Sequence, residues 1–205
     1  MSILLAGNAG VVADVDEARN VQIFQTVPGY ASAGGWYSVA GRSGTGLIAA
    51  ALATDTSLMS ARLSASSIRK AYITRMRVMM VNAVAGASAG TPSIIGLQKT
   101  TTATLTGGTT RTSTRLGPTK GTATDITDIR DSNTALGVAS VVFTDEIAQC
   151  VTPTAGTSTA PFEWIMEFPA PLELSAGDGI VLRTRQLGPA TAQFYFTYTM
   201  YWFER

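Results

Sequence analysis

The C-terminal stretch of the chain alternates between apolar and more polar residues, which restricts it to one kind of structure. Its even positions form a continuous apolar series: Ala192, Phe194, Phe196, Tyr198, Met200 and Trp202. The odd positions, Gln193 to Phe203, are more amphipathic. Because successive side chains of a β-strand leave opposite faces, this period of two predicts a long strand with one buried face. Its aromatic content is typical of a strand at the centre of a core.

Shorter strand-like runs recur through the rest of the chain between clusters of Gly, Pro, Ser and Thr, and no long stretch has helical periodicity. The expected strands are 21–26, 36–40, 71–81, 138–143, 162–168 and 179–185. A turn at Ala176–Gly179, marked by its Asp-Gly pair, precedes the last of these. For Gly46–Arg69, a strand with a turn is favoured over a short helix.

The strand expected at 71–81 has two dissimilar faces. The alternation predicts that Tyr72, Met76, Val78 and Met80 point to one side and that Arg75 and Arg77 point to the other. This spacing is typical of a half-buried strand.

These patterns predict an all-β fold, an antiparallel β-sandwich or jelly-roll-like single domain over residues 1–205. Ala, Thr, Gly and Ser account for 94 of the 205 residues, and Thr suits the pleated surface of a sheet. Residues 1–20 are interpreted as a candidate N-terminal arm. The Thr-rich residues 99–127 are interpreted as a loop or an extended hairpin arm, closed near Gly107 and Gly108.

Charge is segregated along the chain although the net charge is only +1. Residues 56–124 contain nine basic residues and no Asp or Glu, whereas residues 125–205 contain ten acids and four bases. Such a chain has complementary surfaces to offer to another copy of itself or to an acidic partner. Nucleic acid is a less favoured partner, because Tyr72 is the only aromatic residue within the basic segment.

The chain lacks residues that several classes of function usually need. The chain has no His, the commonest acid–base residue in catalysis, and one cysteine, Cys150, in an apolar setting that indicates a small buried side chain. We therefore expect a protein that is not an enzyme, with no catalytic, cofactor-binding or metal-ligating residues. The N-terminus does not resemble a signal peptide, and no apolar run is long enough to span a membrane.

Two local patterns have ordinary structural interpretations. Gly41–Gly46 resembles a phosphate-binding loop, but it lacks the Gly-Lys-Ser/Thr ending and is interpreted as a turn. The acids Asp125, Asp128 and Asp131 are interpreted as solvated, with Arg130 as a local counter-charge.

Three groups of motifs suggest a known family. The first group is Tyr37–Thr45, Leu47–Ala53 and Ser57–Leu63; the second is Leu105–Gly108, Arg111–Ser113 and Asp125–Arg130; the third is Pro171–Arg183 and the aromatic strand that closes with Trp202, Phe203 and Glu204. In this order they resemble a family of virion structural proteins of tailed bacteriophages and prophages. The resemblance implies a β-sandwich or jelly-roll-like subunit on or in the virion, and it brings no catalytic residues with it.

The resulting expectation is a capsid decoration or cement subunit, made in the host cytoplasm and incorporated into the virion. Its partners would be the major capsid protein or another virion protein, and copies of itself, with a trimer favoured. The expected docking residues are Arg62, Arg69, Lys70, Arg75 and Arg77, which would contact acidic shell surface.

Two alternatives remain open. The first is a tail, neck or fibre-associated virion protein on the same scaffold. The second is a carbohydrate-binding β-module acting on the host envelope, which would recruit Trp36 and Tyr37 or Phe162–Trp164, although these tryptophans are more simply interpreted as core.

Overall fold

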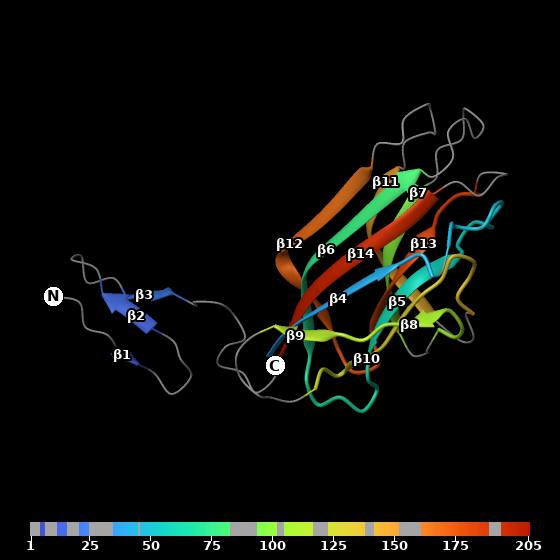
Figure 1. Ribbon diagram of the computed structural model, residues 1–205. Helices are drawn as coiled ribbons and strands as arrows, with labels where there is room; N and C mark the ends of the chain where they lie inside the picture. Colours follow the sequence, from blue (N-terminus) through green and yellow to red (C-terminus); the bar gives the residue numbers. More distant parts are fainter. Residues whose placement is uncertain are drawn as a thin grey trace.

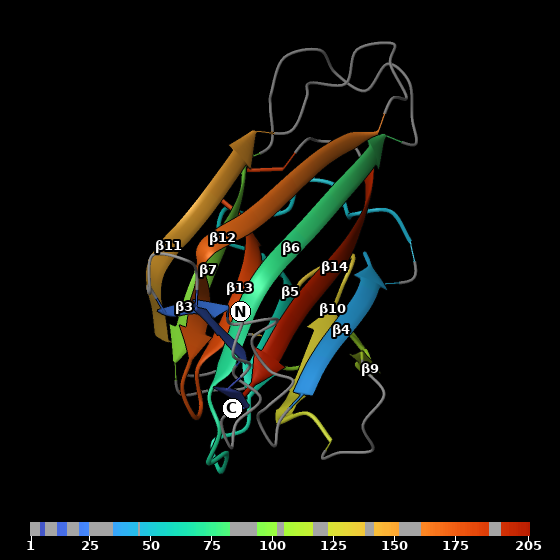
Figure 2. The same ribbon diagram turned by 90° about the vertical axis from the view of Figure 1, so that its left-hand side faces the viewer.

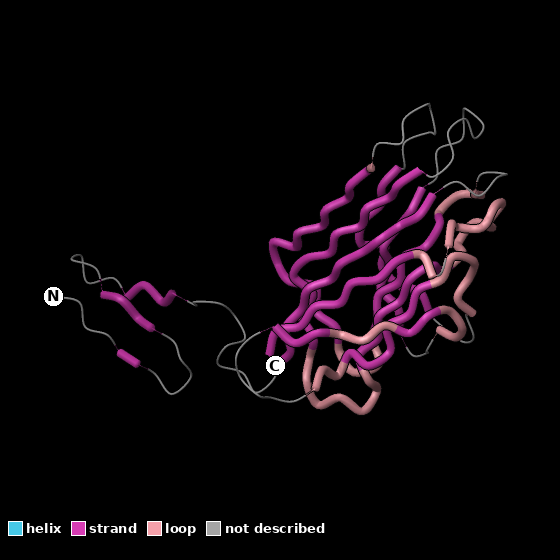
Figure 3. Tube along the Cα trace, in the orientation of Figure 1, coloured by secondary structure: helices cyan, strands magenta, loops and turns pink. Residues whose placement is uncertain are grey.

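The computed structural model describes residues 5–6, 12–15, 21–24, 35–44, 46–82, 94–101, 105–116, 123–137, 142–151, 161–188 and 194–205. Its strands are β1 (Leu5–Ala6), β2 (Val12–Val15), β3 (Val21–Phe24), β4 (Gly35–Arg42), β5 (Ser57–Leu63), β6 (Ala71–Asn82), β7 (Ile94–Thr101), β8 (Thr109–Thr110), β9 (Thr114–Leu116), β10 (Ile126–Asp131), β11 (Val142–Val151), β12 (Phe162–Leu174), β13 (Gly179–Thr184) and β14 (Phe194–Glu204). The described residues include no helix (Figure 3).

Two antiparallel sheets pack face to face, so the expected all-β sandwich is confirmed (Figures 1 and 2). The six-stranded sheet has the order β11-β7-β13-β5-β10-β8, and the five-stranded sheet has the order β12-β6-β14-β4-β9. One hydrophobic core lies between them and takes side chains from both sheets, among them Leu58, Leu97, Met76 and Phe196. The jelly-roll variant of this architecture stays a prediction.

β14 is the central strand of the five-stranded sheet, as its aromatic alternation predicts. Its even residues from Phe194 to Trp202 are buried, and Phe196, Met200 and Trp202 have no exposed surface. β6 and β4 flank it with regular antiparallel pairing along almost its whole length. The strand therefore supplies the largest share of aromatic packing between the two sheets.

A bulge in β6 corrects the expected side-chain pattern of that strand. Met76 pairs with Met200, but Ile73 pairs with Trp202, so Thr74 is an extra residue that reverses the alternation. Met76, Val78 and Met80 face the core as expected. Tyr72 instead leaves the sheet on the other side, where its ring stacks on Phe203 at 4.9 Å between centroids.

The Thr-rich segment 99–127 contributes to both sheets in its described parts. β7 ends at Thr101, β8 pairs with β10 in one sheet, and β9 pairs with β4 in the other. Gly107 and Gly108 form a left-handed turn just before β8, with φ of 76° and 68°. Residues 105–116 thus run from one sheet to the other, and the interpretation of 99–127 as a loop or an extended hairpin arm stays a prediction.

Three further turn and strand predictions can be compared with the structure. Gly46–Arg69 contains β5 and turns, and Gly41–Gly44 is the end of β4 followed by a turn, in both cases as expected. The turn before β13 is closed by a hydrogen bond from the N–H of Asp178 to the carbonyl of Ser175 at 2.8 Å, with Gly177 at φ 84°. The expected strand 138–143 lies outside the described residues up to position 141.

Residues 1–20 were interpreted as an arm, and their described parts belong to a small antiparallel sheet, β1-β2-β3. β2 pairs with both neighbours, and β3 coincides with the first four residues of the strand expected at 21–26.

Candidate functional site

The five expected docking residues are distributed over three parts of the sandwich. Arg62 is on β5, in the six-stranded sheet, and Arg69 and Lys70 lie in the turn between β5 and β6. Only Arg75 and Arg77 lie together on one face, the solvent side of β6. The five residues do not form one basic surface, and their docking role stays a prediction.

The outer face of the five-stranded sheet carries many exposed or half-buried side chains. We define this outer face by the outward residues Ala40, Arg42, Arg75, Arg77, Met79, Glu163, Ile165, Glu167, Tyr195, Thr197, Thr199 and Tyr201. The strand register places them in rows, such as Glu167, Arg75 and Tyr201 side by side across three strands. Figure 2 shows β12, β6, β14 and β4 in front of the other sheet.

The charges on the outer face are balanced within the chain. Arg75 lies opposite Glu167, with 3.5 Å between Nε and the carboxylate, and Arg77 contacts Glu163 diagonally across the same strand pair. All four side chains are well exposed, so these pairs are weak. Two bases of the acid-free segment 56–124 therefore form ion pairs with acids of the C-terminal segment 125–205 on the neighbouring strand.

Exposed apolar side chains lie among these ion pairs. Ile165 is 45% exposed between Glu163 and Glu167, and Tyr195 is 42% exposed at the start of β14, two strands away and beyond the end of β12 in the register. The outer face therefore presents two large exposed apolar or aromatic side chains besides its charged pairs.

Arg69 belongs to a buried ion cluster at the end of β14, which we call the Glu204 cluster: Glu204, Asp125 and Arg69. Glu204 is fully buried and accepts hydrogen bonds from the backbone N–H of Asp125 at 2.9 Å and of Ile126 at 3.3 Å, and from Trp202 Nε1 at 3.2 Å. Arg69 Nε donates to Asp125 at 2.9 Å, which lowers the pKa of that carboxyl and raises the pKa of the guanidinium. The guanidinium of Arg69 therefore contributes to the fold through its ion pairs with Asp125 and Glu204.

A second buried cluster corrects the interpretation of Asp131 as a solvated acid. Asp131 has no exposed surface and accepts two hydrogen bonds from Arg111, at 2.6 and 2.8 Å, and one from the Tyr198 hydroxyl at 3.1 Å. Burial is the main cause of the raised pKa of Tyr198. We call Asp131, Arg111 and Tyr198 the Asp131 cluster. A side chain on Gly41 would collide with it, because a Cβ there would lie 2.4 Å from the Tyr198 hydroxyl.

The two clusters contain residues from the second and third groups of family-like motifs, Arg111 and Asp125 from the second and Glu204 from the third. Gly41, from the first group, lies against the Asp131 cluster. No sequence spacing indicates their proximity, because it follows from the order of the strands.

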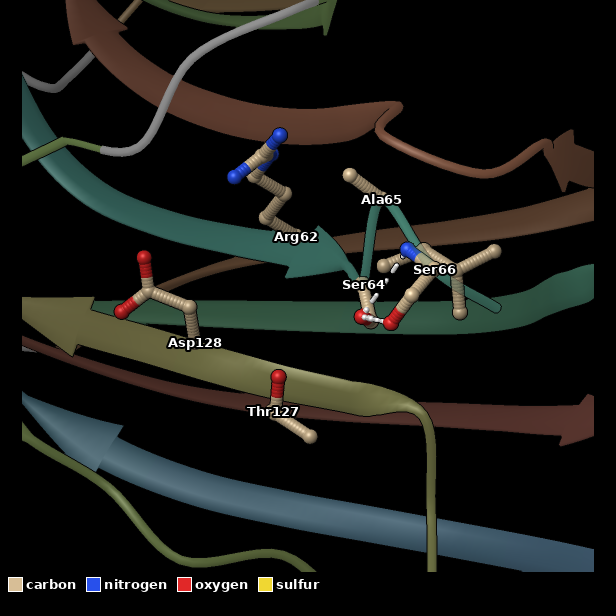
Figure 4. Close-up of a pocket in the computed structure, with 7 residues that line it drawn as sticks. Arg62, Ser64, Ala65, Ser66, Thr127 and Asp128 are labelled. Atoms are coloured by element: carbon tan, nitrogen blue, oxygen red, sulfur yellow. Dashed lines mark hydrogen bonds between the residues drawn. The ribbon is translucent and has the colours of Figure 1, made fainter.

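Arg62 lines an open pocket of about 350 Å³ at the end of β5 and the start of β10 (Figure 4). The other lining residues are Leu63, Ser64, Ala65, Ser66, Thr127 and Asp128. Arg62 Nε donates to the carbonyl of Gly177 at 3.2 Å, and the hydroxyls of Ser64 and Ser66 are 2.9 Å apart. The pocket offers hydrogen-bonding groups, but its lining contains a single carboxylate, whereas glycoside hydrolysis uses a pair.

The tryptophans considered for carbohydrate binding are both half-buried. Trp36 packs against Phe203 at 5.2 Å between ring centroids, and Trp164 packs against the main core. Cys150 also packs on that core, and burial raises the pKa of its thiol to about 12.

The described part of the chain contains no group of three or more acidic or cysteine side chains arranged to hold a metal ion. It also contains no helix long and apolar enough to cross a membrane. Comparison with protein-family models, with curated proteins and with solved structures gave no match. The fold and its surfaces therefore define the class of this chain as an all-β sandwich.

Proposed function

We propose that this chain is a structural protein of a bacteriophage virion, a decoration or cement subunit that stabilises the capsid through protein–protein contacts. The outer face of the five-stranded sheet supports this most directly, because it presents exposed charges and exposed apolar side chains on one side of a sheet. The virion as the place of this role comes from the resemblance of the sequence motifs to virion proteins of tailed phages.

In this proposal the outer face docks on the shell, with Arg75 and Arg77 as the residues that contact shell carboxylates. Their own partners, Glu163 and Glu167, are exposed and weakly held, so a shell carboxylate competes with them readily. Ile165 then adds apolar area between the two ion pairs, and Tyr195 adds it at the end of the outer face. Repetition over many copies makes weak single contacts collectively strong.

The proposal is tested by binding of the purified chain to shells that lack it, measured by co-sedimentation. The double variant Arg75→Gln/Arg77→Gln removes two charges from the outer face without creating repulsion, and we expect it to lose binding. Arg62→Gln, on the other sheet, is the matched control and should bind as the wild type does. Equal binding by all three proteins would contradict the assignment of the outer face.

A further inference from the structure

The open pocket beside Arg62 lies on the side of the six-stranded sheet that faces away from the core. Its walls are the end of β5, the turn that follows β5, and the start of β10. Arg62 lies between Ala61 and Leu63, which both belong to the core, so its side chain leaves the sheet on the opposite side. The pocket volume of about 350 Å³ is within the roughly 300–1,000 Å³ of small-molecule sites.

A β-bulge at the start of β10 contributes one wall of the pocket. In the register with β5, Ile126 lies opposite Leu63 and Asp128 lies opposite Arg62, so Thr127 has no residue opposite it. An extra residue of this kind bends its strand and redirects side chains, and bulges recur beside functional sites. Thr127 is exposed and lines the pocket. The pocket thus lies where the regular pairing of β5 and β10 is interrupted.

The turn after β5, which forms the facing wall, is fixed by hydrogen bonds within the chain. The Ser64 N–H donates to the carbonyl of Asp125 at 2.9 Å, and the Ser64 carbonyl accepts from the Ser67 N–H at 3.1 Å. The Ser67 hydroxyl lies 2.6 Å from the carboxylate of Asp125, which is a member of the Glu204 cluster. The wall that contains Ser64 and Ser66 is therefore preorganised, which reduces the entropy lost on binding.

The polar groups of the pocket form two sets. Arg62 and Asp128 lie opposite each other on neighbouring strands, and the hydroxyls of Ser64 and Ser66 are 2.9 Å apart. Figure 4 shows Arg62 and Asp128 on the left, Ser64 and Ser66 on the right, and Thr127 below them. The lining thus presents a guanidinium that only donates, a carboxylate that only accepts, and hydroxyls that do both.

A neutral ligand rich in hydroxyl groups matches this lining best. The lining contains one guanidinium and one carboxylate, so an anion would be repelled by Asp128 and a cation by Arg62. A hydroxyl group accepts from Arg62 and donates to Asp128 at the same time. Arg130 Nε also donates to Asp128, at 2.6 Å, which helps to hold the carboxylate in place. The lining has no aromatic ring, so binding relies on hydrogen bonds, and we expect a low affinity.

We propose that this pocket binds a neutral saccharide through adjacent hydroxyl groups. Arg62 is the charged donor, Asp128 is the charged acceptor, and the hydroxyls of Ser64, Ser66 and Thr127 are the remaining partners. The single carboxylate means that the saccharide is bound and not hydrolysed by a carboxylate pair. The proposal does not depend on the proposed docking. A subunit docked through the five-stranded sheet would leave the pocket open to solution, because the pocket belongs to the other sheet.

The test is titration of the isotope-labelled full chain with D-glucose, D-galactose and D-mannose, followed by NMR amide chemical shifts. We expect at least one of these hexoses to shift the amides of Ser64, Ser66 and Thr127. Inorganic phosphate and glycine, as an anion and a zwitterion, should shift them less. No shift with any hexose, shifts confined to other parts of the chain, or larger shifts with phosphate or glycine would each overturn the proposal.

Three substitutions examine the proposed partners one at a time. Arg62→Gln removes the charged donor and Asp128→Asn removes the charged acceptor, so each should weaken hexose binding about tenfold. Thr127→Val removes a hydroxyl at an exposed position without changing charge, and should weaken binding to a smaller extent. Asp145→Asn, exposed on β11, is the matched control and should bind as the wild type does.

The direction of the change in Asp128→Asn separates a saccharide site from an anion site. Loss of this carboxylate weakens the binding of a hydroxyl donor, whereas it would tighten the binding of an anion. The amide spectrum of each variant also reports whether it is folded. Tighter binding by Asp128→Asn, or wild-type affinity in all three folded pocket variants, would contradict the proposal.

Discussion

At the scale of single residues, Glu204 and Asp131 are the acids on which the structure depends most, since neither has exposed surface. Both are held by arginines, Arg69 and Arg111, from distant parts of the sequence. From the sequence alone, these four residues are indistinguishable from solvated surface charges. Burial is decided by the three-dimensional order of the strands, so sequence patterns did not reveal either cluster.

The substitution Glu204→Gln tests the Glu204 cluster. The carboxylate accepts from two backbone N–H groups and from Trp202, and the amide of Gln would direct an NH₂ group at some of these donors. Leaving buried donors unsatisfied costs about 1–3 kcal/mol, so we expect a loss of this size in the free energy of unfolding. Urea unfolding measures it. Glu163→Gln, in an exposed ion pair, is the control and should change stability by less than about 1 kcal/mol; equal losses would contradict the account.

The pairing of Asp125 with Arg69 predicts a particular acid sensitivity. The hydrogen bond from Arg69 lowers the pKa of Asp125 in the folded state. The stabilisation is therefore present at pH values above the unfolded-state pKa, about 3.9, and is lost as the pH falls through the lower folded-state pKa. We expect the urea midpoint to drop in this acid range, and Asp125→Asn to drop less steeply than the wild type. Parallel profiles for the two proteins would show that the pair does not link stability to pH.

At the scale of elements, the alternation of side chains predicted the strands well and failed where the register changes. β14 follows its period of two without interruption, and the pattern predicted both its buried face and its central place. β6 contains the bulge at Thr74, and the assignment of Tyr72 to the core face was wrong for that reason. A bulge adds one residue without changing composition, so the pattern contained no signal for it.

The turn at Gly107 and Gly108 allows a matched pair of substitutions. Both glycines have positive φ, so an alanine at either position is strained by roughly 1–2 kcal/mol. At Gly107 a Cβ would meet nothing within 4 Å, whereas at Gly108 it would lie 2.5 Å from the carbonyl oxygen of Asp131. We expect Gly107→Ala to lose about 1 kcal/mol and Gly108→Ala clearly more, by thermal or urea unfolding. Similar losses at both positions would mean that Gly108 has more space than its contacts indicate.

At the scale of the whole molecule, the segregation of charge along the sequence has a structural explanation. Bases of the acid-free segment pair with acids that follow it, as in Arg75 with Glu167, Lys70 with Glu173 and Lys99 with Asp178. The sequence predicted complementary surfaces, and most of that complementarity is satisfied within one chain. Which of these charges lie side by side depends on the order of the strands in the two sheets, and the sequence alone does not reveal strand order.

The central claim, a structural role in the virion, is tested most directly by counting this chain in purified phage particles. Quantitative mass spectrometry would compare its copy number with that of the major capsid protein. The account predicts a ratio near one, or a simple fraction of it, because a decoration subunit repeats over the shell. A dozen copies or fewer would place the protein at the neck or tail instead of on the shell. Its absence from the particles would contradict the structural role altogether.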